Sequence, residues 1–166
     1  MQELNNKKCE KPIISYKNNE LVFYSETEGV SFISTISDAD IKTYSNNRIV
    51  LSLTYNITVY AKKNGYEDSD IATATLCWID AEPKSEGLND GISQIRAKAL
   101  LIQTENGQIT ITGTDDGTKI YAYEINGLQV GSTICHNGRA DITTNLKPGS
   151  IAIIKIGDRS VKVVIK

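Results

Sequence analysis

SIAIIKIGDRSVKVVIK, the stretch at residues 150–166, holds two runs rich in β-branched residues on either side of a Gly157-Asp158 turn. β-Branched side chains favour an extended backbone, and apolar residues at every second position mark a strand with one buried face. The second run has this period in Val161, Val163 and Ile165, with Lys162, Val164 and Lys166 on the other face. The stretch therefore predicts two paired strands with one face turned towards a core.

The same period recurs in the first half of the chain. Between residues 54 and 61, one face of an extended segment would carry Tyr55, Ile57, Val59 and Ala61. No stretch of the chain shows a convincing helical period. Short strands at intervals of about 8–12 residues are typical of β-sandwiches, so we expect an all-β fold.

Turn dipeptides separate several of the predicted strands in the second half of the chain. Asn-Gly and Asp-Gly favour the positive φ angles that tight hairpins need. The sequence has such pairs at Asn106-Gly107, Asp116-Gly117 and Asn126-Gly127. Each of them predicts a hairpin.

A polar segment from Asp80 to Gly91 interrupts the strand pattern. It contains Pro83 and Gly87 and has no periodicity, which is typical of a linker. The charge balance also changes there, because residues 1–82 carry 8 basic and 12 acidic residues and residues 83–166 carry 10 and 8. We therefore predict two small sandwiches, with these boundaries: an N-terminal extension 1–10, a sandwich 11–80, a linker 81–91 and a sandwich 92–166.

Composition restricts the classes of function. The 166 residues are 40% hydrophobic and 23% charged, have a net charge of −2 and include one histidine. A disordered chain would be less hydrophobic, and a membrane-spanning helix needs about 20 apolar residues in a row. The charge is too small to suggest a nucleic-acid partner. We expect a folded domain pair with no transmembrane segment, no cofactor and no metal.

No catalytic motif emerges from the spacing of reactive residues. Cys135 and His136 are adjacent, so on an extended chain their side chains point to opposite faces. The segment Gly113–Lys119 is one residue short of a phosphate loop and holds two aspartates where phosphate would lie. Because no acid–base or nucleophile pair can be assembled, we predict that the chain is not an enzyme.

Aromatic residues and cysteines supply the remaining candidates in the first half. Tyr44, Tyr66 and Trp78 are candidates for stacking against a sugar, although aromatic residues at strand positions also serve as core. Cys9 and Cys77 flank the first predicted sandwich, whose first and last strands could be neighbours. A disulfide between them is one alternative and free thiols are the other, and Cys135 would be unpaired in either case.

The segment Thr54–Asp70, TYNITVYAKKNGYEDSD, resembles a strand–turn–strand motif of small domains of the chitobiase C-terminal type. The resemblance covers about residues 11–76. It implies an immunoglobulin-like or fibronectin-III-like sandwich, and such domains are usually non-catalytic attachments to larger proteins.

Residues from about 95 to 166 resemble the C-terminal sorting domain of the type IX secretion pathway of Bacteroidetes. The motif Ile120–Gly127, IYAYEING, and the closing strand pair carry this resemblance. Leu128 stands where the family often has Arg, and Ala152 where it often has Tyr. The whole arrangement is similar to the C-terminal tails of leucine-rich-repeat surface proteins of that phylum.

These resemblances imply a non-catalytic module pair of a secreted or outer-surface protein. Its role would be spacing, presentation and export or surface attachment of an upstream region, with upstream domains or secretion machinery as partners. The polar N-terminus has no signal peptide, which the resemblance explains by a tail fragment. The alternative is an adhesion module in which aromatic residues of the first domain bind a glycan or a host protein.

Overall fold

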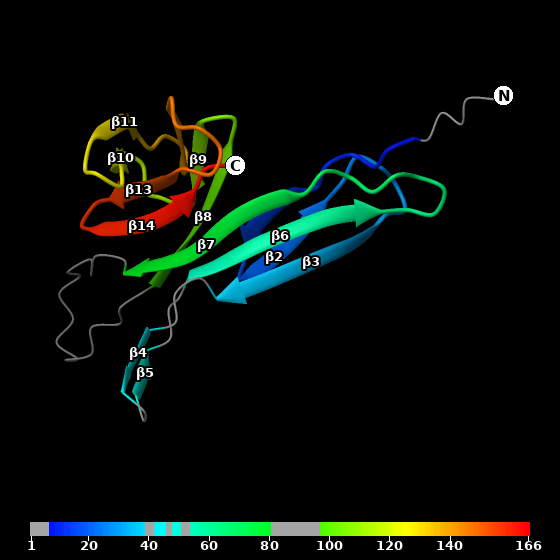
Figure 1. Ribbon diagram of the computed structural model, residues 1–166, viewed down its shortest axis with the longest axis horizontal. Helices are drawn as coiled ribbons and strands as arrows, with labels where there is room; N and C mark the ends of the chain where they lie inside the picture. Colours follow the sequence, from blue (N-terminus) through cyan, green and yellow to red (C-terminus); the bar gives the residue numbers. More distant parts are fainter. Residues whose placement is uncertain (1–6, 39–41, 46–47, 51–53, 81–96) are drawn as a thin grey trace. The chain divides into compact units, whose positions relative to one another are not determined.

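The computed structural model describes residues 7–38, 42–45, 48–50, 54–80 and 97–166 (Figure 1). Within these ranges the chain forms strands and turns with no helix, and the strand pairs are antiparallel, so the all-β prediction is confirmed. The chain divides into two compact units, Met1–Thr75 and Leu76–Lys166. The division falls inside a strand, and the linker predicted at 81–91 lies outside the described residues.

The first unit contains two hairpins and a longer strand pair. Its strands are β1 (Ile13–Lys17), β2 (Glu20–Tyr24), β3 (Ser31–Asp38), β4 (Lys42–Ser45), β5 (Arg48–Val50), β6 (Thr54–Lys62) and the start of β7 (Ala72–Asp80). β1 pairs with β2, β3 with β6, and β4 with β5.

Alternation along β6 builds the core of this unit. Ile57, Val59 and Ala61 are almost completely buried, while the residues between them are partly exposed. The predicted period of two is therefore confirmed here. Phe32 of β3 continues this face and lies against Phe23 of β2, with ring centroids 6.0 Å apart.

A short turn after β6 is fixed by one buried hydroxyl group. The Ala61 amide donates to Ser69 Oγ over 2.7 Å, and Ser69 Oγ donates to the Asp70 carbonyl over 2.9 Å. The ammonium group of Lys63 lies 4.7 Å from the centroid of the Tyr66 ring. A buried amide without a hydrogen-bond partner costs about 1–3 kcal/mol, so Ser69 stabilises this turn by accepting the hydrogen bond of the Ala61 amide.

The second unit contains two antiparallel sheets and the end of β7. The strands are β8 (Ala97–Glu105), β9 (Gln108–Thr112), β10 (Lys119–Glu124), β11 (Gln129–Ile134), β12 (Arg139–Thr143), β13 (Ile151–Ile156) and β14 (Arg159–Val164). One sheet has the order β11-β10-β13-β14, and the order β12-β9-β8 belongs to the other.

One core is shared by both sheets, which is the arrangement of a β-sandwich. Leu100, Ile109 and Ile111 come from one sheet, and Ile120 and Ile154 from the other, each at 0% exposure. The predicted terminal hairpin forms as β13 and β14, with Ile154 opposite Val161. Val163 and Ile165 are buried, as the alternation predicts.

The predicted hairpins are confirmed at two of the three turn dipeptides. Asn106 and Gly107 have φ angles of 50° and 78° between β8 and β9, as the tight Asn-Gly turn requires. Asn126-Gly127 joins β10 to β11. The prediction is wrong at Asp116-Gly117, because β9 and β10 belong to different sheets. The Gly117 amide instead donates to the Cys135 carbonyl, which fixes a crossover between the sheets.

Candidate functional site

The outward face of the sheet β11-β10-β13-β14 carries the most distinctive group of exposed side chains in the second unit. Alternation in β10 buries Ile120 and Ala122 and leaves Lys119, Tyr121 and Tyr123 on the opposite face. Both tyrosines are half-buried, and their ring centroids lie 6.4 Å apart at an angle of 36°. The two rings therefore lie next to each other along β10, with their planes tilted relative to each other.

Cross-strand pairing extends this face over the whole sheet. Tyr121 lies opposite Ser132 on β11 and opposite Lys155 on β13, while Tyr123 lies opposite Ile153. Ile153 in turn lies opposite Lys162 on β14. We call these outward-facing residues the tyrosine face: Lys119, Tyr121, Tyr123, Ser132, Ile134, Ile151, Ile153, Lys155, Ser160, Lys162 and Val164.

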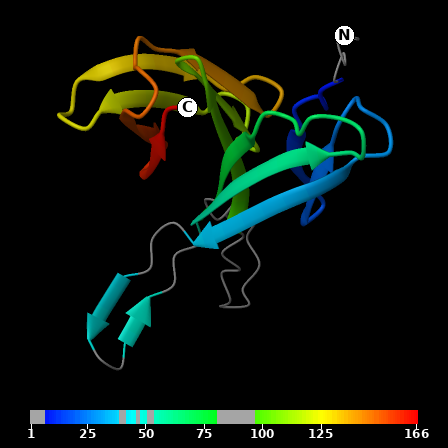
Figure 2. The ribbon, with the colours of Figure 1, turned by 45° about the vertical axis from the view of Figure 1, so that its right-hand side comes forward.

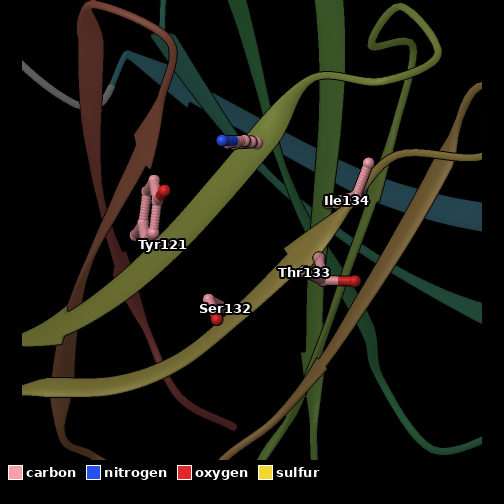
Figure 3. Close-up of a pocket in the computed structure, with 5 residues that line it drawn as sticks. Tyr121, Ser132, Thr133 and Ile134 are labelled. Carbon is pink, nitrogen blue, oxygen red and sulfur yellow. The ribbon is translucent and has the colours of Figure 1, made fainter.

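A shallow pocket of about 200 Å³ opens on one side of the tyrosine face, between β10 and β11 (Figure 3). It is lined by Lys119, Tyr121, Ser132, Thr133 and Ile134. Figure 3 shows Tyr121 and Ser132 on neighbouring strands of this sheet. The lining joins one aromatic ring, hydroxyl groups and an ammonium group.

Charge on the tyrosine face has one sign. Lys119, Lys155 and Lys162 are exposed, and none of the outward positions of these strands is occupied by an acidic residue. β10 and β13 each have neighbours on both sides, so their backbone groups are used within the sheet. A ligand on this face would therefore be bound by side chains, through ring surfaces, hydroxyl groups and ammonium groups.

The three aromatic residues predicted as stacking candidates are not gathered on one element. Tyr66 lies in the turn after β6, half-buried beside Lys63. Trp78 lies on β7 and is also half-buried, and Tyr44 lies on β4 at a position whose side chain is outside the description. Tyr121 and Tyr123, which alternation brings together on one face, were not among the sequence candidates although their spacing of two was visible in the sequence.

All three cysteines are buried free thiols. The disulfide between Cys9 and Cys77, one of the two alternatives from the sequence, is not formed in this structure. Cys77 belongs to the same buried core as Leu100 and Ile102 of the second unit, although the sequence placed it in the first domain. Thr114 Oγ1 donates to Cys135 Sγ over 2.8 Å, so that thiol has a local polar partner.

Burial raises the pKa of the Cys77 thiol to about 11 from 9.0. The unfolded chain then loses this proton at a lower pH than the folded chain does, so the thiol reduces stability above pH 9. We expect the free energy of unfolding to fall by about 2 kcal/mol more in the wild type than in Cys77→Ala between pH 8 and pH 11. Denaturant titrations of both proteins at each pH measure this difference, and equal pH dependence would contradict it.

Within the described ranges the structure offers neither a metal-binding cluster nor a membrane-spanning helix. No three His, Cys, Asp or Glu side chains within these ranges lie close enough to hold a metal ion. No helix among the same residues has the length and hydropathy to cross a membrane. His136 is exposed in the turn before β12, where its amide donates a hydrogen bond to the Arg139 carbonyl.

Comparisons of the chain with protein-family models, with curated proteins and with solved structures found no match.

Proposed function

We propose that this chain is a non-catalytic module pair of a secreted or cell-surface protein. The first unit is an immunoglobulin-like or fibronectin-III-like spacer, and the second is a type IX sorting-domain-like sandwich. In this role the chain holds an upstream region at the outer surface and takes part in its export. The partners are then the upstream domains and the secretion machinery.

One observation carries the proposal: both segments that resemble the sorting domain adopt the local structure that the resemblance implies. The motif IYAYEING forms strand β10 and the turn after it, with Gly127 at a φ of 89°. The closing strand pair forms β13 and β14. In the first unit, the motif with the resemblance to the chitobiase C-terminal type forms β6 and the turn that Ser69 fixes.

An export assay tests this role. The whole chain is fused behind a reporter that is directed to the periplasm of a bacterium with a type IX pathway. We expect the reporter outside the outer membrane, and we expect it in the periplasm when the fusion ends at Thr75 and so lacks the second unit. A full-length fusion that stays in the periplasm would overturn the export role.

A second candidate function is binding of an acidic polysaccharide, and the tyrosine face favours it. Tyrosine rings present apolar surfaces and a hydroxyl group, which suit a sugar ring. The three lysines on this face complement carboxylate groups on a chain of uronic acids. The proposal moves the glycan site from the first domain, where the sequence placed it, to the second.

Alginate, a polymer of uronic acids, is the probe for this candidate function. We expect the chain to bind alginate and to bind neutral dextran at least about tenfold more weakly, because Lys119, Lys155 and Lys162 would face carboxylates only in alginate. The double variant Tyr121→Ala, Tyr123→Ala should lose about tenfold in affinity, measured by calorimetry at low salt.

The control is Tyr24→Ala, which removes a tyrosine side chain that is 58% exposed on β2 of the other unit. An equal loss in this control, or no binding of alginate by the wild type, would contradict the glycan site. Equally tight binding of a single-stranded oligonucleotide would show a general polyanion surface instead.

A further inference from the structure

β3 is a long strand at the margin of its sheet. In the part of the chain that the structure describes, β6 is its neighbour on one side and no strand lies on the other. Figures 1 and 2 both show it at this margin, next to β6. The strand therefore presents a free row of backbone amide and carbonyl groups, to which another strand can add.

The strands at the sheet margins of the second unit have features that discourage such pairing. β14 carries Arg159 and Lys162, and β12 carries Arg139 and Asp141. The pairing of β11 with β10 is interrupted by a bulge between Ala122 and Tyr123. Charges and bulges are the usual means by which proteins protect exposed strand edges.

β3 has none of these features over most of its length. Residues 31–37 read SFISTIS and contain no charge, proline or glycine. Ile33 is 45% exposed and Ile36 is 54% exposed, although Ile36 lies opposite the buried Ile57 on the core side of the pair. The margin of this sheet is thus uncharged, rich in β-branched residues and incompletely covered.

We propose that β3 pairs with β3 of a second copy of this chain, in antiparallel register about Ser34. A two-fold axis at Ser34 places Phe32 of each copy opposite Ile36 of the other, on the face that Val59 shares. This register brings the exposed Ile36 side chain against an aromatic ring. Because residues 31–37 contain no charged side chain, no like charges lie opposite each other in this register.

The self-complementary register favours a second copy over an unrelated strand. An unrelated strand would need a residue pattern of its own that matches β3. Two copies of β3 form the same pair, Phe32 with Ile36, on both sides of the axis at Ser34. A single strand pair is a small interface, so the association is expected to be weak and concentration-dependent. Sedimentation velocity from about 5 to about 500 µM covers the range in which such a dimer forms.

We expect the wild-type mass to rise from 18.2 kDa towards twice that value across this range. Ser34→Lys should keep the chain monomeric, because the two new charges lie opposite each other on the axis. Thr58→Lys is the matched control and should dimerise like the wild type, since β6 has neighbours on both sides. Circular dichroism confirms that each variant is folded.

Ser34→Cys provides a second test that does not depend on destabilising the dimer. Residues directly opposite each other in antiparallel strands can be close enough for a disulfide, so mild oxidation should yield a covalent dimer. Thr58→Cys should not yield one. A wild type that is monomeric at all concentrations, a dimer that survives Ser34→Lys, or no cross-link through Cys at position 34 would each overturn the proposal.

Discussion

Replacing Ile154 with alanine is expected to lower the free energy of unfolding of the second unit by about 2–5 kcal/mol. Ile154 is completely buried in β13 and lies between Ala122 of β10 and Val161 of β14. Removing three carbon atoms from this position removes buried apolar surface and leaves a cavity between the sheets. Urea denaturation followed by near-UV circular dichroism measures the change.

Ile151 provides the control on the same strand. Its side chain is 39% exposed on the outward face, so Ile151→Ala should cost less than about 1 kcal/mol. If both substitutions cost the same, the assignment of the two faces of β13 would be wrong. The comparison thus tests the alternation on which the sandwich and the tyrosine face both depend.

Gly113→Ala is expected to cost about 3 kcal/mol or more in the second unit. Gly113 has a φ of 102°, and a Cβ atom there would collide with the carbonyl oxygen of Ala99. Its amide also donates to the Gly138 carbonyl over 2.9 Å, so the backbone cannot withdraw without losing that hydrogen bond. The obstacle is the backbone of Ala99, which moves less readily than a side chain.

Gly117 separates the effect of the collision from that of the backbone angle. Its φ is 82°, but no atom lies within 4 Å of the position a Cβ would take. Gly117→Ala should therefore cost only about 1 kcal/mol, the usual strain of alanine at positive φ. Equal losses of stability in the two variants, measured by thermal unfolding, would show that the close approach to Ala99 is absent.

Strand alternation was the part of the fold that the sequence predicted best. β6 buries residues that the period of two selects, and in the last run of the chain Val163 and Ile165 are buried while Val161 is partly buried. The reason is physical: a strand at a core boundary has only two faces, and the apolar residues identify the buried one. The Asn106-Gly107 hairpin was predictable for a similar reason, because local φ preferences determine that turn.

Pairing between distant strands was not predictable from local preferences. Asp116-Gly117 has the composition of a hairpin turn but serves as a crossover, because β10 pairs with β13 and not with β9. Cys77 joins the core of the second unit for the same kind of reason. Which strand lies next to which depends on contacts far apart in the sequence.

The candidate binding site was predicted less well than the fold. Tyr66 and Trp78 were chosen by residue type, and they lie on separate elements. The tyrosine face combines residues of β10, β11, β13 and β14, so it becomes visible only when the strand order is known. Tyr121 and Tyr123 at a spacing of two on a strand were the signal that could have indicated it.

Protease treatment of intact cells that express the full fusion tests the role of surface module most directly. A reporter held at the outer surface is digested while the outer membrane remains closed, and we expect this result for the chain with both units. A reporter that is protected in intact cells and becomes sensitive only after the outer membrane is opened would contradict the proposed surface role.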